Sequence, residues 1–384
     1  MSVDQRAYWV WLQHALGAGS SKQNRILSGY RSLNDFYAAG MESWLLEGYF
    51  TQNELGKLGS FSIGDAEALL EYCEKIGQQV LTPGCAGYPE PLGEIHNAPC
   101  ALYVRGTLPD FSAVPSIAIV GTRKATATGI ATARSFAFEL AKQGAVVVSG
   151  GALGIDTAAH KGALQAGGKT VCVLGCGIDY NYLMGNASLR EAVALSGAVI
   201  SEYPPNTQAV NSNFPIRNRI ISGLTLGTLV VEAAGKSGSL ITAQYALDQG
   251  RDVFAVPAGI YSPVSQGVNG LIKSGAKPVS NAGEILEEYL YRFPGQIDFR
   301  DEETNVILSP EPAPVQPAAG PLDEKEFSED AVLLYSSLTD SPKHLSELER
   351  LTGISAPRLL TAVTELELAE KIRSHSGRRY SLSV

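Results

Sequence analysis

Six short apolar runs between residues 116 and 258 constrain the fold more than any other feature of the sequence. Each run is rich in β-branched residues and is followed by a glycine-rich turn and then by a stretch of helical periodicity. The runs are SIAIVG, AVVVSG, KTVCVLG, AVISEY, GTLVVEA and DVFAVPA. Continuous apolar runs that alternate with helices are typical of parallel strands covered on both faces. The sequence therefore predicts an α/β protein with a doubly wound, mainly parallel sheet.

The stretches on either side of these runs predict further domains. The chain has 384 residues, which is more than one hydrophobic core usually organises. Short helical patches joined by Gly and Ser predict a helical domain at 1–80, of the SAM-like or helix-hairpin-helix-like type. The Pro/Ala-rich stretch SPEPAPVQPAAGPL predicts a linker at 293–325, after a sheet domain at 81–292. Three helical patterns and a hairpin predict a winged helix at 326–384.

The composition argues against several classes of protein. No apolar run approaches the roughly 20 residues of a membrane span, and the first residues lack the features of a signal peptide. We therefore expect a cytoplasmic protein without a membrane partner. The cysteines include no CxxC pair and have no histidine at zinc-finger spacing. Neither disulfides nor a bound metal are expected.

An open parallel sheet binds its ligands beyond the carboxyl ends of its strands. In this sequence the residues at those positions are mostly glycines, hydroxyl residues and cations. They are Thr122, Arg123 and Lys124; Ser149, Gly150 and Gly151; Gly175, Cys176 and Gly177; Phe214 to Arg219, a range that includes Asn218; and Lys236, Ser237, Gly238 and Ser239. Free N–H groups at helix starts, hydroxyl donors and guanidinium groups together favour an anion.

The segment FPIRNRIISG raises the question of what its two arginines bind. The chain has 39 acidic residues against 30 Lys plus Arg, so this is not a generally basic protein. Arg217 and Arg219, two residues apart, do not share a helical face and are costly to bury unpaired. One interpretation is that they bind an anionic ligand. The other is that they form internal salt bridges with Glu202 or Glu232.

Two enzyme-like interpretations have weaker support. GGALG lacks the GxGxxG spacing of a dinucleotide site, and no acidic residue ends the following strand KTVCVLG. Asp156 and His160 are four residues apart, which suits either acid/base work or a helix cap with a packed histidine. No nucleophile with triad spacing, Walker A motif or metal-binding carboxylate pair accompanies them. We expect a protein that is not an enzyme and has no cofactor.

Taken in order, the turns resemble the DNA-processing protein A (DprA/Smf) family of bacteria. The matching segments run almost without a gap from about 116 to 278. They are IAIVGTRKATATG, VVSGGALGIDTAAHKGAL, TVCVLGCGID, ISEYPP, FPIRNRIISGL, LVVEAAGKSGSLITAQYALDQGRDVFAVPAG and GVNGLIKSGA. The order of all seven is far more specific than any single glycine motif. The alternative is a Rossmann-like nucleotide-processing hydrolase of the lysine-decarboxylase-like type, but VPAGIYSP lacks its PGGxGT order.

The resemblance implies an extended Rossmann-like domain that binds single-stranded DNA, forms a homodimer and loads the RecA recombinase during natural transformation, without catalysis. It implies that arginines hold phosphates and that Phe214 stacks on a base. The DNA-binding residues would be Gly121, Thr122, Arg123, Lys124, Ser149, Gly150, Gly151, Phe214, Arg217, Asn218, Arg219, Lys236, Ser237, Gly238, Ser239 and Lys273.

Some parts of the chain depart from this pattern. Leu153 stands where the family usually has Arg, Leu183 lies in a loop that usually reads Tyr-Pro…Asn, and Ala258 replaces a common residue of a VPG turn. In the winged helix, acidic residues outnumber basic ones, and the would-be recognition helix APRLLTAVTELELAE is itself acidic. We therefore expect protein contact or an auxiliary role there, unless the wing alone touches DNA. Whether residues 1–80 bind DNA or protein stays open.

Overall fold

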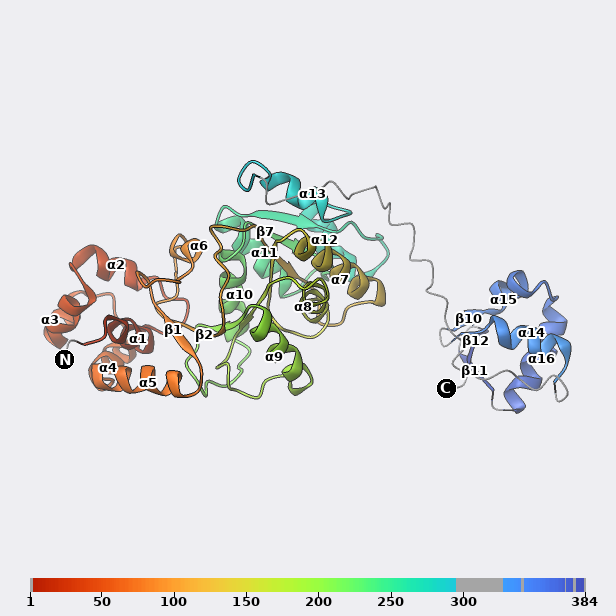
Figure 1. Ribbon diagram of the computed structural model, residues 1–384, viewed down its shortest axis with the longest axis horizontal. Helices are drawn as coiled ribbons and strands as arrows, with labels where there is room; N and C mark the ends of the chain where they lie inside the picture. Colours follow the sequence, from red (N-terminus) through yellow and green to blue (C-terminus); the bar gives the residue numbers. More distant parts are fainter. Residues whose placement is uncertain (1–2, 295–326, 340–341, 370, 376–377, 383–384) are drawn as a thin grey trace. The chain divides into compact units, whose positions relative to one another are not determined.

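The structure is a computed structural model that describes residues 3–294, 327–339, 342–369, 371–375 and 378–382. The chain divides into two compact units, Met1–Asp301 and Glu302–Val384 (Figure 1). Nearly all of the predicted linker at 293–325 lies outside the described residues. In the part of the chain that is described, no helix is long and apolar enough to cross a membrane.

The first unit is built on a sheet whose described part has nine strands in the order β1-β2-β6-β5-β4-β3-β7-β8-β9. The strands are β1 (Gln79–Leu81), β2 (Leu102–Gly106), β3 (Ser116–Val120), β4 (Val146–Ser149), β5 (Thr170–Leu174), β6 (Ala198–Ser201), β7 (Gly227–Val230), β8 (Asp252–Ala255) and β9 (Lys277–Pro278). The strands from β3 to β9 pair in parallel. Strand β2 is antiparallel to β1 and β6. This topology confirms the predicted doubly wound, mainly parallel sheet.

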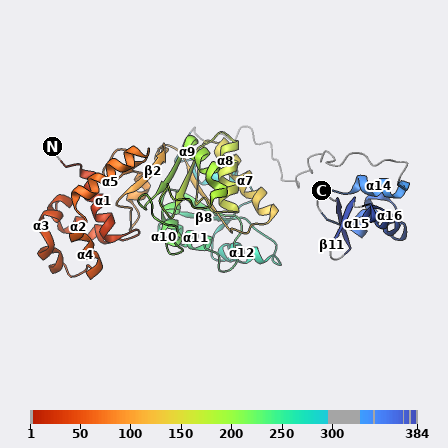
Figure 2. The same cartoon turned by 90° about the horizontal axis from the view of Figure 1, so that it is seen from below.

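Helices cover both faces of this sheet. They are α7 (Ala127–Lys142), α8 (Ile155–Gln165) and α9 (Ala187–Ser196) on one face, and α10 (Asn213–Gly223), α11 (Ser239–Asp248) and α12 (Gln266–Lys273) on the other (Figure 2). Alternate residues of β3 fill the two cores. Ile117 and Ile119 pack in the core with α7 and α8, whereas Ala118 and Val120 pack in the core with α10 and α11. Burial on both faces explains why the strands are apolar throughout.

The N-terminal helices pack onto the sheet through a continuous hydrophobic core. Trp11 and Phe36 belong to the same buried cluster as Leu174 and Val199 of the sheet. The helices are α1 (Gln5–Leu16), α2 (Lys22–Gly29), α3 (Leu33–Leu46), α4 (Gln52–Ser60) and α5 (Ile63–Lys75), with the short α6 (Glu90–Gly93) following β1. Capping boxes fix the starts of α4 and α5. The helical segment is therefore joined to the sheet by apolar packing.

The second unit is a winged helix, as the sequence predicts. Its helices are α14 (Glu329–Ser337), α15 (Leu345–Thr352) and α16 (Ala356–Leu368), and its small sheet has the order β10-β12-β11, from β10 (Lys343–His344), β11 (Ile372–His375) and β12 (Arg379–Leu382). Arg358, the cation of α16, pairs with Asp330 at 2.6 Å. Since this internal pair occupies the arginine, α16 gains no positive face for phosphates.

Candidate functional site

A cavity of about 380 Å³ lies at the carboxyl ends of β3 and β7. From β3 the chain winds outward through β4, β5 and β6, and from β7 it winds the other way through β8 and β9. The cavity thus occupies the point where the strand order reverses, which is where open parallel sheets bind ligands. We call it the strand-end cavity. The predicted site residues that line it are Gly121, Arg123, Phe214, Arg217, Asn218, Ser237, Gly238 and Ser239.

The remaining predicted residues lie outside the lining of the strand-end cavity. Thr122, Lys124 and Lys236 belong to the same turns, after β3 and β7, and both lysines are exposed. Lys273 is exposed at the end of α12. The turn after β4 is buried: Gly150 and Gly151 are buried, and the Ser149 hydroxyl donates to the Ile119 carbonyl at 2.7 Å. This turn supports the site through its backbone.

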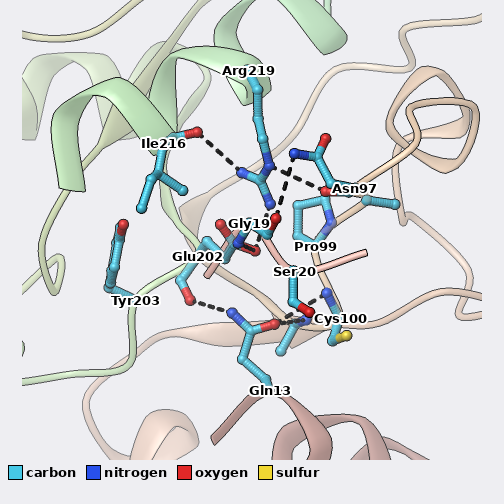
Figure 3. A network of polar contacts seen from close by, with 12 residues as sticks. Gln13, Gly19, Ser20, Asn97, Pro99, Cys100, Glu202, Tyr203, Ile216 and Arg219 are labelled. Atoms are coloured by element: carbon cyan, nitrogen blue, oxygen red, sulfur yellow. Dashed lines mark hydrogen bonds and ion pairs between the residues drawn. The ribbon is translucent and has the colours of Figure 1, made fainter. Parts of the chain in front are cut away.

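Arg219 does not face the strand-end cavity, which corrects the prediction that it binds DNA. Its side chain is fully buried, and its Nη2 pairs with Oε1 of Glu202 at 2.7 Å (Figure 3). Its Nε donates to the carbonyl of Asn97 at 3.1 Å. Residues two apart point about 200° apart around an α-helix. Because Arg217 faces the cavity from α10, Arg219 has to face the other way. Of the two interpretations of this arginine, the internal salt bridge with Glu202 is therefore the one that the structure shows.

Arg217 lies in the wall of the strand-end cavity and is only 4% exposed. Its Nη1 donates to the carbonyls of Gly150, at 2.7 Å, and Val173. Its buried Nε has no hydrogen-bond partner among the residues described. A buried guanidinium that is not fully bonded is costly, so this side chain has donor capacity left for an anion.

Asp156 is the buried carboxylate of the strand-end cavity. Its Oδ2 accepts from the backbone N–H of Ala152 at 3.3 Å, at the start of α8. Burial raises the pKa of Asp156 to about 6, while Arg217 and the backbone N–H groups of Ala152 and Gly150 act in the opposite direction. At neutral pH the carboxyl group is therefore mainly ionised and offsets part of the Arg217 charge.

His160 does not form an acid/base couple with Asp156. Its Nδ1 lies 2.8 Å from Oγ1 of Thr170, which itself donates to the Val147 carbonyl at 2.7 Å. The hydroxyl proton is thus committed, so Nδ1 carries a proton and donates it to Thr170. Burial, together with the nearby charge of Arg217, lowers the pKa of His160 to about 3. His160 is a neutral, packed side chain, which agrees with the non-catalytic interpretation of the sequence.

We expect replacement of His160 with glutamine to remove an acid sensitivity of the fold. In the wild type the unfolded imidazole takes up a proton near pH 6.5, whereas the folded one, with its pKa near 3, does not. Stability is thus lost as the pH falls, by about 2 kcal/mol between roughly pH 7.5 and 5. Between these two pH values, the free energy of unfolding measured in urea should fall by about 2 kcal/mol more for the wild type than for the variant. Equal losses in both proteins would contradict a buried neutral histidine.

Glu232 fixes the first turn of the site instead of pairing with an arginine. Its two carboxylate oxygens accept from the hydroxyl and the backbone N–H of Thr126, at 2.5 and 3.0 Å. Thr126 caps α7, where a negative charge is favourable. A Cβ on Gly129 would lie 2.3 Å from the Glu232 carboxyl carbon, so only glycine leaves room for it. The 121–126 turn is thereby held with Arg123 exposed at the mouth.

Phe214 is the aromatic residue of the strand-end cavity. The Arg123 guanidinium lies 5.2 Å from its ring centroid and that of Arg217 lies 5.9 Å away. Gly175 supports the ring, since a Cβ there would lie 3.0 Å from it. The Tyr182 ring is 5.3 Å away at 35°. Tyr182 is not among the site residues predicted from the sequence, although an aromatic residue in the loop after a parallel strand is a signal for this position.

Comparisons with known proteins show what this chain is similar to. The family model "DNA recombination-mediator protein A" matches residues 79–290, and that of the DprA winged helix domain matches 311–378. Protein Smf of Synechocystis is 30% identical over 99% of both chains. The structure of DNA processing protein A from Streptococcus pneumoniae has a TM-score of 0.58 at 31% identity, covering 75% of this chain and 99% of that one.

A second solved structure concerns single-stranded DNA. It is DNA processing protein A from Helicobacter pylori, described by its single-stranded DNA binding mode, with a TM-score of 0.51 at 29% identity. The match covers 56% of this chain and 96% of that one.

Proposed function

Because the chain belongs to the DNA recombination-mediator protein A family, we propose that it binds single-stranded DNA in the strand-end cavity and has no catalytic activity of its own. We further propose that it acts in the cytoplasm as a homodimer, protects incoming strands and loads the RecA recombinase onto them during natural transformation. The observation that carries the proposal is a buried, incompletely bonded Arg217 beside Phe214 and the exposed Arg123.

The contents of the cavity favour a single strand over a duplex. Phe214 lies inside the cavity, with two guanidinium groups within 6 Å of its ring. An aromatic face can accept a base only if that base is unstacked from its neighbours, as bases of a single strand are. The guanidinium groups suit the phosphate next to such a base. Hydroxyls at Ser237 and Ser239 add donors at the start of α11.

The second candidate, a nucleotide-processing hydrolase, is favoured by one observation. Asp156 lies in the cavity with its pKa raised to about 6, within the range of a general acid or base. However, its Oδ2 accepts from the backbone of its own turn, His160 bonds to Thr170, and Glu232 bonds to Thr126, the N-cap of α7. Release of free base from nucleoside monophosphates, abolished by Asp156→Asn, would establish the hydrolase instead.

We expect Arg123→Ala to weaken the binding of a dT oligomer by about 1–3 kcal/mol, because the side chain holds a phosphate at the mouth of the cavity. The salt dependence should fall by about 0.7 in the log–log slope, as expected for one lost phosphate contact on a single strand. Fluorescence anisotropy at several salt concentrations measures both. The variant should unfold at the same temperature as the wild type, since Arg123 is exposed.

Arg134→Ala is the matched control. Arg134 is also exposed and lies on α7, but its Nε bonds to Gln165, away from the strand-end cavity. Arg134→Ala should leave the binding of the dT oligomer unchanged.

A duplex of equal length should bind more weakly than the dT oligomer, and gel shifts with added RecA test the loading step. Equal binding of duplex and single strand would indicate unspecific electrostatic attraction and contradict the proposal.

A further inference from the structure

We propose that Tyr182 is a second base-stacking residue, which receives the nucleobase next to the one on Phe214. This inference rests on the proposed function, because it extends the same single-stranded DNA site. The two ring centroids are 5.3 Å apart and the ring planes are inclined by 35°. Tyr182 is only partly buried, and so is Phe214. Two neighbouring rings that are both partly exposed can each present an aromatic surface to one of two successive bases.

The other neighbours of Phe214 are a glycine and two arginines. Gly175 lies against one part of its ring, and the Arg123 and Arg217 guanidinium groups lie near it from the cavity. Tyr182 extends the aromatic surface beyond the lining of the cavity. A base on Phe214 would have its phosphate near the arginines, and the neighbouring base of the same strand would meet Tyr182.

The loop that carries Tyr182 is built to hold it there. The next residue, Leu183, has φ of 47°, a left-handed conformation that costs free energy for a residue with a side chain. The Leu183 carbonyl accepts from Nη1 of Arg190 at 3.3 Å and from the backbone N–H of Asn186 at 2.8 Å. Both Arg190 and Asn186 are buried. Buried polar groups thus stabilise a strained turn whose effect is to place Tyr182 against Phe214.

The same loop is tied to the site by a further contact. The Asn186 amide donates to the Gly151 carbonyl at 3.3 Å and to the Thr157 hydroxyl at 2.9 Å. Gly151 belongs to the turn after β4, whose Gly150 carbonyl binds Arg217. The loop that carries Tyr182 is therefore bonded to the same turn that bonds to Arg217.

The test compares two strands of equal length, a dT oligomer and an abasic oligomer with the same phosphates. If Tyr182 stacks on a base, Tyr182→Ala should weaken dT binding by about fivefold or more and leave abasic binding within about twofold. Tyr182→Phe should keep dT binding near the wild-type value, since stacking needs the ring and not the hydroxyl. Tyr180→Ala, which removes a ring from the same loop, is the control and should not discriminate between the strands.

Each result of this experiment either supports or overturns the proposal that Tyr182 stacks on a base. Equal weakening for both strands by Tyr182→Ala would show that the residue only supports the loop and would overturn the proposal. Unchanged dT binding would overturn it as well. If the wild type bound neither strand, the proposed function itself would be wrong, which is a separate result.

Discussion

Replacing Arg219 with leucine is expected to lower the free energy of unfolding of the Met1–Asp301 unit by about 3–5 kcal/mol. The Glu202 carboxylate would remain 2% exposed without its cation. Its Oε2 already lacks a partner among the described residues, and its Oε1 would retain only the Gly19 N–H at 3.2 Å. An uncompensated buried charge is among the most destabilising changes a folded protein can carry. Urea unfolding followed by tryptophan fluorescence measures the loss, since Trp11 belongs to the N-terminal core.

Two further variants show whether the charge is the cause. The double variant Glu202→Leu with Arg219→Leu removes both charges and should recover much of the loss, because a buried ion pair is often replaceable by apolar residues. Lys75→Leu breaks an exposed pair with Glu71 and should change stability by less than about 1 kcal/mol. A double variant as unstable as Arg219→Leu would point to lost packing and not to an unpaired carboxylate.

The two arginines of α10 together hold this helix from two sides. Arg217 binds the carbonyls of Val173 in β5 and of Gly150 after β4. Arg219 binds Glu202, which follows β6. The Glu202 carbonyl accepts from Nε2 of Gln13 in α1, and the Gln13 Oε1 accepts from the Cys100 backbone N–H (Figure 3). The N-terminal helices and the helix that carries Phe214 are thus joined by buried polar bonds, in addition to the shared apolar core.

The long parallel strands could be predicted because their signal is local. Strands β3 to β8 correspond to the six apolar runs, each buried on both faces. Strands β1 and β9, with three and two residues, are too short for any periodicity to appear. Helix α5 lies within the helical domain predicted at 1–80, and its capping box and the spacing of Ile63, Ala66 and Leu70 are local signals of a helix. The edge strands are defined by pairing with their neighbours, which no short stretch of sequence contains.

The location of the site could be predicted from the sequence, but the orientation of every side chain could not. Carboxyl ends of parallel strands meet at one edge, so the grouping of Arg123, Phe214 and Arg217 follows from topology. The direction of Arg219 depends on Glu202, 17 residues away, and on Asn97, 122 residues away. Such tertiary partners leave no periodic signal. The same holds for Tyr182, whose position depends on a strained loop and its buried anchors.

Replacing Arg217 with alanine is expected to combine a large loss of stability with loss of single-stranded DNA binding. The carbonyls of Gly150 and Val173 would lose their donor, at about 1–3 kcal/mol for each one left unsatisfied. Asp156, only 7% exposed, would lose the neighbouring cation that lowers its pKa. We expect a total loss of about 3–5 kcal/mol in the free energy of unfolding, measured in urea.

The pH dependence of this loss separates its two causes. Burial already raises the pKa of Asp156 to about 6, and removal of Arg217 should raise it further. A raised folded-state pKa means that stability is present at low pH and is lost as the pH rises through that value. Arg217→Ala should therefore be less destabilising at about pH 5 than at pH 8, and Asp156→Asn in the same background should abolish that difference. Because the asparagine removes the buried charge without restoring a guanidinium, the double variant should still fail to bind a dT oligomer. Recovery of binding along with stability would show that Arg217 only supports the structure and that the phosphate is held elsewhere.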